Sequence, residues 1–453
     1  MAIKIVELWS VSPTDGGAAE QTLPLVYFDM IWLHSPPADT LYFYDSKYSE
    51  SYFFNTVAVK LKHSLSIALK YFLPFASNII FPLTSPAMPL SRYTAGDSVA
   101  LTIATSDADF ANLTSNRSRV ADEFHQFVPE MRPAVYSSDD VKFSAIAIQV
   151  TLFPNKGICI GFRDHHAVCD AASLFGFLRT WASIHKSNGD TNLAQDSLPF
   201  YDRSRVQDAS KLASVIWEQV KASRPTVLQT NSLPLHKVRA SFILSDAEIK
   251  KLKKFAKMKN PSASTFVVVC AHLWSCLAES AAAAGEEVDD NETEYLTSAV
   301  DCRARLNPPL PDTYFGNCLV FLRARSSHGR LKGDGGFAAA VEAIAAAVRE
   351  AVDGNGGRGV LDGFENQLQS DVELKGKRVT RIAGSPWLDP CGADYGWGRS
   401  IKYEGVHTDY DGAVNLCMAP RGGGVEVGLS MPKLKIDAFA AIFKEKIFIN
   451  SNL

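Results

Sequence analysis

A polar, turn-rich segment at residues 186–236 limits the folds open to this chain, because it separates two parts that each carry apolar periodicity. It begins "KSNGDTNLAQDSLPFYDRS" and ends "SRPTVLQTNSLPLH", runs rich in Ser, Asn, Asp and Pro. A chain of 453 residues is also too long for one ordinary hydrophobic core. We therefore expect one domain at 1–185, a linker or crossover at 186–236, and a second domain at 237–453.

Both parts mix predicted strands with predicted helices. In the first part, "FSAIAIQVTLF" and "GICIGF" flank "PNKG", which predicts two strands and a turn between residues 143 and 163. A helix should follow at about 171–185. In the second part, "VRASFILSDAEIKKLKKFA" predicts a strand and then a helix, with Ser245 and Glu248 in capping-box spacing. The sequence therefore predicts an α/β protein.

Composition excludes several classes of function. The chain is 46% hydrophobic and 21% charged, and its net charge of −3 gives no sign of a nucleic-acid partner or of a basic face for membranes. We expect no run of about 18 to 20 apolar residues that could span a membrane. The eight cysteines show no ligand-like spacing. We therefore expect a cytoplasmic protein with no nucleic-acid or membrane partner.

The stretch "GFRDHHAVCDAASLFGF" at 161–177 places His166 four residues before Asp170. His166 follows a six-residue apolar strand and precedes a predicted helix, a context in which side chains are rigidly held. His407 and Asp411 have the same spacing but lie in a polar, glycine-flanked stretch. Local context alone supports equally a functional His166 and a semi-buried histidine with satisfied hydrogen bonds.

Metal and nucleophile chemistry are the alternatives at this stretch. The adjacent His165 and His166 would point to opposite faces of a strand, and no HExxH motif or third ligand is present, so we expect no metal site. No GxSxG motif occurs, and Cys169 is not flanked by cations that would lower the pKa of its thiol. His166 would then act directly as a general base on a substrate hydroxyl, with Asp170 fixing the local geometry.

Two motifs in this order give a resemblance to a known family. "HHAVCD" and, about 230 residues later, "DYGWG" at 394–398 resemble the paired motifs of the plant BAHD acyl-CoA-dependent acyltransferases. "YFGNC" at 314–318 and "LPLVYFDMIWL" at 23–33 are similar to the branch that acylates anthocyanins and other flavonoid or phenolic glycosides, often with malonyl-CoA. The chain departs from the usual pattern at Tyr395, where Phe is common, and at Ala171, where many members have Gly.

The resemblance implies an α/β fold of two chloramphenicol-acetyltransferase-like domains, each a mixed β-sheet with helices, with an active-site channel between them. It also implies a monomer with no bound cofactor that uses an acyl-CoA as co-substrate. His166 would take the proton of the acceptor hydroxyl as that hydroxyl attacks the thioester, without an acyl-enzyme. The further roles carried over are oxyanion donors at Asn317 and Trp397, a structural pair of Asp170 with Arg303, and structural support by Asp394, Gly396 and Gly398.

Contacts to the acyl-CoA are expected at four positions. Lys259, in the basic run "KKLKKFAKMK", could meet CoA phosphates, and Ser264 and Thr265 just beyond it could contact phosphate or pantetheine. Arg179, on the predicted helix after Asp170, could pair with a malonyl carboxylate. The simpler alternatives are a solvated helix face for the lysines and an ordinary surface cation for Arg179.

The first functional hypothesis is transfer of an acyl group, most often malonyl, from acyl-CoA to a hydroxyl of a flavonoid, anthocyanin or phenolic glycoside. The second keeps the reaction but uses an aromatic, hydroxycinnamoyl-type CoA with an alcohol or amine acceptor. The third is a non-catalytic binding protein on the same fold. Condensation domains of peptide synthetases share the HHxxxD pattern, but "DYGWG" and the absence of carrier domains argue against that reading.

Overall fold

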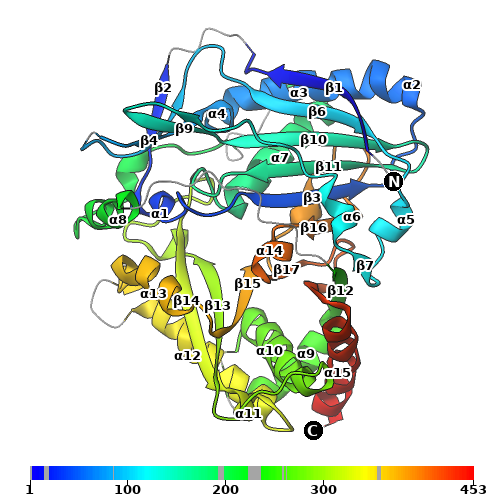
Figure 1. The fold of residues 1–453 in the computed structure, drawn as a ribbon, viewed down its shortest axis with the longest axis vertical. Helices are drawn as coiled ribbons and strands as arrows, with labels where there is room; N and C mark the ends of the chain where they lie inside the picture. Colours follow the sequence, from blue (N-terminus) through cyan, green and yellow to red (C-terminus); the bar gives the residue numbers. More distant parts are fainter. Residues whose placement is uncertain are drawn as a thin grey trace.

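The computed structural model describes residues 3–14, 20–84, 86–191, 198–222, 236–257, 260–261, 263–354 and 359–452. Its strands form three sheets (Figure 1). The first sheet has the order β1 (Lys4–Val11), β6 (Val99–Thr105), β10 (Ile146–Phe153), β11 (Gly157–Asp164), β3 (Ala38–Tyr44) and β16 (Lys402–Gly405). A smaller sheet has the order β2 (Gln21–Pro24), β5 (Leu90–Tyr93), β4 (Asn78–Pro82), β9 (Asp140–Ser144) and β8 (Val135–Tyr136).

The second large sheet is built mainly from the later part of the chain. Its order is β14 (Leu319–Ser327), β13 (Thr293–Asp301), β15 (Arg378–Gly384), β17 (Val414–Met418), β18 (Gly424–Pro432), β12 (Lys237–Ser245) and β7 (Arg119–Val120). Each large sheet thus takes one strand from the other part of the chain. β16 pairs with β3 in the first sheet, and β7 pairs with β12 in the second. Figure 1 shows β16 beside β3, between the upper sheet and the lower elements.

Helices pack on these sheets. The long ones are α3 (Ala58–Tyr71), α7 (Ala171–Lys186), α8 (Leu212–Lys221), α9 (Asp246–Lys257), α10 (Thr265–Ala283), α12 (Gly336–Asp353) and α15 (Lys433–Asn452). The short ones are α1 (Tyr27–Met30), α2 (Glu50–Tyr52), α4 (Leu73–Ala76), α5 (Phe110–Leu113), α6 (Asp122–His125), α11 (His328–Leu331), α13 (Gln367–Glu373) and α14 (Thr408–Asp411). Figure 1 shows α9, α10 and α15 gathered at one end of the molecule.

Three local predictions are confirmed. The predicted strands are the hairpin β10–β11, in which Phe153 pairs with Gly157 across the turn. The predicted helix at 171–185 is α7. The capping box also forms, because the backbone N–H of Ser245 donates to the Glu248 carboxylate at 2.7 Å and the backbone N–H of Glu248 donates to the Ser245 hydroxyl at 3.3 Å.

The expectation that the chain has no apolar run long enough to span a membrane was wrong. Helix α10 is long and apolar enough to cross a membrane by length and composition alone. However, 72% of its apolar window is buried inside the protein, where it packs in the core of the second large sheet with α9, α12 and α15. A helix that is apolar all round is also what a fully enclosed core position requires.

The described part of the 186–236 segment is packed against other elements. Phe200 forms a β-bridge with Tyr314, and the 3-10 turn Arg203–Arg205 follows. Helix α8 then buries Ile216 and Trp217. Residues 198–222 of this segment are therefore anchored to the core through buried side chains such as Ile216 and Trp217.

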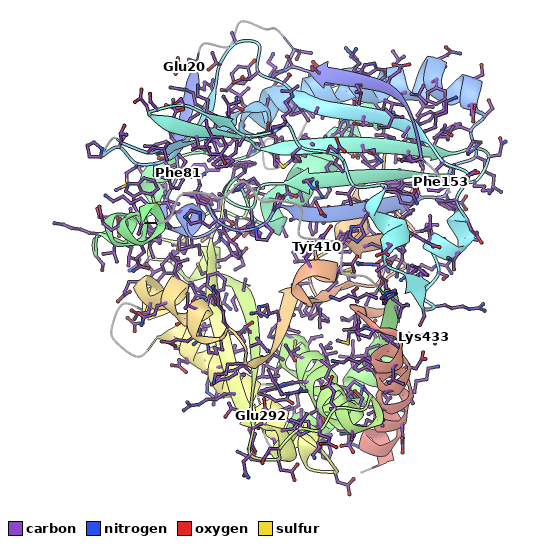
Figure 2. The ribbon with its side chains drawn as sticks, viewed as in Figure 1. Glu20, Phe81, Phe153, Glu292, Tyr410 and Lys433 are labelled. Atoms are coloured by element: carbon purple, nitrogen blue, oxygen red, sulfur yellow. The ribbon has the colours of Figure 1, made fainter. Side chains whose placement is uncertain are left out.

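A buried charge cluster joins the two large sheets. Glu404 on β16 accepts hydrogen bonds from Arg119 of β7, at 2.5 Å, and from Arg239 of β12, at 3.1 Å. Arg239 also pairs with Asp409 of α14. Burial by itself would raise the pKa of Glu404, but Arg119, Lys402 and Arg239 together lower it to about 2. Figure 2 labels Tyr410, the neighbour of Asp409, where the upper and lower parts of the molecule meet.

The Glu404→Gln substitution should destabilise the protein by about 3–5 kcal/mol at pH 7, because it leaves the buried Arg119 guanidinium without a carboxylate and removes one of the two that pair with Arg239. The effect depends on pH. A carboxylate with a lowered pKa stabilises the fold above its ordinary value of 4.5, and that stabilisation is lost as the pH falls toward 2. Urea unfolding of both proteins at several pH values should show the difference shrinking below about pH 4.5.

A suitable control is Asp437→Asn in the exposed pair of Lys433 with Asp437. A surface substitution of this kind changes stability by no more than about 0.5 kcal/mol. Equal losses for the two variants would contradict a special role for the buried cluster.

Candidate active site

The turn between β11 and α7 holds the two adjacent histidines in different surroundings. The His165 ring is buried against Phe143, and burial lowers the pKa of His165 to about 4. His166 is half-buried, and its Nδ1 atom is shielded from solvent. Since Nδ1 is shielded, Nε2 is the nitrogen left to meet a substrate.

Asp170 ties this turn to the YFGNC loop. Its carboxylate caps α7 by accepting the Ser173 N–H at 3.1 Å. It also accepts Arg303 Nη2 at 2.8 Å and the Cys318 N–H at 3.2 Å. The same guanidinium donates to the carbonyls of Tyr314 and Gly316. The structure therefore pairs Asp170 with Arg303, as expected, and gives both an orienting role.

Asn317 does not fit the role of oxyanion donor. Its side-chain Nδ2 donates to Asp29 at 3.0 Å and to the carbonyl oxygen of His166 at 2.9 Å. A carboxamide has two N–H donors, and both are used here. Asn317 is fully buried and holds the backbone of His166 rather than offering a donor to a tetrahedral intermediate.

Asp29, which the sequence analysis did not single out, anchors Asn317. Its carboxylate is fully buried and accepts the backbone N–H groups of Asn317, at 2.8 Å, and Val26, at 3.1 Å. Burial raises the pKa of Asp29, and Arg203, 3.5 Å away, opposes that rise. An aspartate inside the apolar run "LPLVYFDMIWL" was the available signal, because a buried carboxylate needs partners.

Two further side chains were missed. The Trp32 indole stacks on the His166 imidazole, with ring centroids 3.8 Å apart and an interplanar angle of 12°. His407, set aside in the sequence analysis, lies near enough for its charge to act on His166. Burial lowers the pKa of His166 below its usual 6.5; its own carbonyl and Asp170 oppose this, and His407 adds to it. His166 is therefore neutral near pH 7 and can accept a proton.

The DYGWG segment is a self-contained turn. One Asp394 oxygen accepts the N–H groups of Gly396 and Gly398, both at 2.8 Å, and the other accepts Lys186 Nζ at 2.6 Å. Both glycines have positive φ, +96° and +82°, which favours glycine at these positions. The Tyr395 carbonyl hydrogen-bonds His185 near the end of α7. This arrangement fits structural support by Asp394, Gly396 and Gly398.

Trp397 lies far from His166 and cannot stabilise an oxyanion there. It packs against His185 and Tyr44. His185 lies at the C-terminal end of α7, a 16-residue helix about 24 Å long whose other end follows His166. Tyr44 pairs with Ile158, at the end of β11 remote from the histidine turn. The expectation for Trp397 was therefore wrong.

The expected CoA contacts are only partly described. Ser264 caps α10 by accepting the Val267 N–H at 3.3 Å, and Thr265 begins that helix. Lys259 lies outside the described residues. Within the described ranges, no group of three or more His, Cys, Asp or Glu side chains is placed to hold a metal ion.

Arg179 lines a cavity of about 300 Å³ beside the start of α7. Arg303 also lines it, but its guanidinium is already paired with Asp170 and Asp301. Asp301, Asp312 and Asp389 add three carboxylates to the same wall. This charge balance does not favour a malonyl carboxylate, so Arg179 is left out of the site proposed below.

These features define a class of enzyme. His166 is a neutral, rigidly held histidine, and the neighbouring Cys169 is not an activated nucleophile, since burial raises the pKa of its thiol well above the usual value. Such a base can take a proton directly from the hydroxyl of a bound substrate.

Comparisons with known proteins identify the family. A model described as the Transferase family matches residues 3–446. A malonyl-coenzyme:anthocyanin 5-O-glucoside-6'''-O-malonyltransferase of Salvia splendens is 38% identical, covering 97% of this chain and 94% of the relative. Phenolic glucoside malonyltransferase 1 of Nicotiana tabacum is also 38% identical, covering 98% and 99%. A coumaroyl-CoA:anthocyanidin 3-O-glucoside-6''-O-coumaroyltransferase of Arabidopsis thaliana is 33% identical, covering 98% and 97%.

The crystal structure of vinorine synthase shares the fold, with a TM-score of 0.68 at 19% identity and 96% of each chain covered. The prediction of a two-domain α/β fold is thereby confirmed. The chain belongs to the Transferase family, the BAHD acyl-CoA-dependent acyltransferases, and is an acyltransferase.

If Asp394 is structural, Asp394→Asn should keep kcat/KM within a few-fold of wild type, because an amide oxygen can still accept the two glycine N–H groups. Asp394→Ala removes that acceptor and should cost about 1 kcal/mol of stability. Steady-state kinetics and thermal unfolding of both variants test this.

Lys186→Met is the matched control, since it removes only the ion pair with Asp394 and should change little. A loss of activity in Asp394→Asn of 100-fold or more would show instead that the carboxylate takes part in the reaction.

Proposed function

We propose that the chain transfers a malonyl group from malonyl-CoA to a sugar hydroxyl of a flavonoid, anthocyanin or phenolic glycoside. The 38% identical relatives carry malonyltransferase names, whereas the coumaroyltransferase relative is 33% identical. The motifs "YFGNC" and "LPLVYFDMIWL" point to the same branch. The observation that carries the chemistry is the neutral His166, held at its carbonyl by Asn317.

The reaction needs one base and no protein nucleophile. Nε2 of His166 takes the proton of the acceptor hydroxyl while the hydroxyl oxygen attacks the thioester carbon. The tetrahedral intermediate then collapses, the C–S bond breaks, and the CoA sulfur takes the proton from the imidazolium. Atoms and charge balance without a metal or a bound cofactor. General base catalysis of this kind contributes about 10²–10⁴-fold to the rate.

We also propose that the protein works in the cytoplasm. All eight cysteines are buried free thiols. Cys302 and Cys318 have their sulfur atoms 3.4 Å apart in a hydrogen bond rather than a disulfide, an arrangement suited to a reducing compartment.

The test is a panel of malonyl-, acetyl- and coumaroyl-CoA against flavonoid and phenolic glucosides, with CoA release as the readout. We expect turnover with malonyl-CoA on at least one glucoside. In His166→Ala, kcat should fall by about 10²–10⁴-fold. The control is His63→Ala, because His63 is an exposed histidine on α3.

The outcomes separate the hypotheses. Turnover confined to coumaroyl-CoA would keep the mechanism and overturn the malonyl donor. Equal, slow CoA release by wild type and His166→Ala would overturn the base and favour a binding protein.

A further inference from the structure

The segment "LPLVYFDMIWL" supplies Asp29, the anchor of Asn317, and also the side chain that covers the imidazole of His166. Trp32 lies in the turn after α1, and its indole is nearly parallel to the His166 ring at a centroid distance of 3.8 Å. A second aromatic ring, Phe321, lies 5.5 Å from the indole and tilts against it. The imidazole is thus backed by an aromatic surface.

The imidazolium that forms during proton transfer needs such support. In a Ser-His-Asp triad, a carboxylate accepts a hydrogen bond from the other ring nitrogen and stabilises the charged ring. In the described part of this chain, no other residue hydrogen-bonds Nδ1 of His166. The nearest candidate, Asp170, directs its carboxylate to Arg303, Ser173 and Cys318 instead.

The charged and titratable groups around His166 do not fully offset the cost of burying its protonated ring, and this shortfall is a deficit in stabilisation of the imidazolium. Asp170, four residues along the same turn, favours the protonated ring. His407, from the segment after β16, disfavours it, and so does any charge on the adjacent His165. Asn317, from the YFGNC loop, contributes a neutral amide that binds the His166 carbonyl. Burial, the largest influence, also disfavours the charge. The carbonyl of His166 itself and the Asn317 amide favour the protonated ring together with Asp170, yet the pKa of His166 still lies below its usual value.

We propose that Trp32 is the positioning residue that offsets this deficit. Its π face holds the His166 ring in one plane and stabilises the imidazolium as the ring takes the acceptor proton, a cation–π interaction with the aromatic ring that binds cations best. This inference rests on the proposed function, because it assumes that His166 is the base.

Trp32 is itself held by the residue that fixes His166 from the other side. Its backbone N–H donates to the carbonyl of Asp29 at 3.1 Å. The Asp29 carboxylate binds Asn317, which binds the carbonyl of His166. Residues 29–32 therefore control both the backbone and the ring of the base, so a shift of this short segment would move both together.

The test compares Trp32→Phe and Trp32→Leu by the pH dependence of kcat/KM. Loss of the π face disfavours the imidazolium, so the His166 pKa falls and the acid limb of the profile moves to lower pH. For Trp32→Leu we expect a shift of about 0.5–1.5 pH units and a fall in kcat of about 2- to 30-fold. Trp32→Phe, which keeps a weaker π face, should lie between Trp32→Leu and wild type.

The matched control is Trp9→Leu. Trp9 lies on β1 and forms a cation–π pair with Lys62, so the substitution also removes a cation–π contact. It should leave the acid limb of the pH profile in place. A purely structural role for Trp32 would lower kcat or raise KM without moving the limb. If the smaller leucine of Trp32→Leu instead let water reach His166, the protonated ring would be better solvated and the acid limb would move to higher pH. Either result overturns the proposal.

A second readout works without turnover. The rate at which diethyl pyrocarbonate modifies His166, followed by peptide mass spectrometry, reports the fraction of neutral imidazole at each pH. The pH midpoint of modification should be lower in Trp32→Phe than in wild type, and lower still in Trp32→Leu. If His166→Ala keeps full activity, the proposed base fails, whereas an unmoved modification midpoint in both Trp32 variants overturns the role of Trp32 alone. Should Trp32→Leu not fold, Trp32→Phe against wild type decides.

Discussion

The ion pair of Asp170 with Arg303 is the interaction on which the site depends. It is almost fully buried, with 2% and 3% of the side chains exposed. A buried pair adds little net stability, because desolvation of both charges offsets their attraction, but loss of one partner is severe. Its value is geometric. The carboxylate caps the first turn of α7, and the guanidinium binds carbonyls of the YFGNC loop. The turn that carries His166 is therefore fixed to a loop that lies far from it in the sequence.

The second requirement is that the two large sheets keep their relative position, because the base belongs to one and the YFGNC loop leads into the other. Two strands fix that position through backbone hydrogen bonds, because β16 pairs with β3 in the first sheet and β7 pairs with β12 in the second. The Glu404 cluster adds charge-assisted bonds across the same junction. Sheets joined only by a polar tether would move as domains commonly do, and a base held on one side could not keep its distance from groups on the other.

Local features were predictable from the sequence, and distant partnerships were not. The hairpin β10–β11, helix α7 and the Ser245 capping box follow from periodicity and turn residues within a few positions. The pairing of Asp170 with Arg303 came from a family resemblance rather than from physics. Asp29, Arg203 and Trp32 escaped notice because their importance lies in contacts across more than 100 residues. The expectation for Trp397 failed for a related reason. Its motif does not reveal its distance from the base, and α7, which lies between them, is about 24 Å long.

The network around His166 also explains how such a site can change substrates without losing its chemistry. The side chains that hold the backbone of the base, Arg203, Asp29 and Asn317, contact one another and the carbonyl of His166. These contacts join protein groups to one another and do not involve a substrate. Side chains that shape the donor and acceptor pockets can therefore vary while the position and protonation of His166 stay constant. Function then follows the pocket, and the fold preserves the reaction.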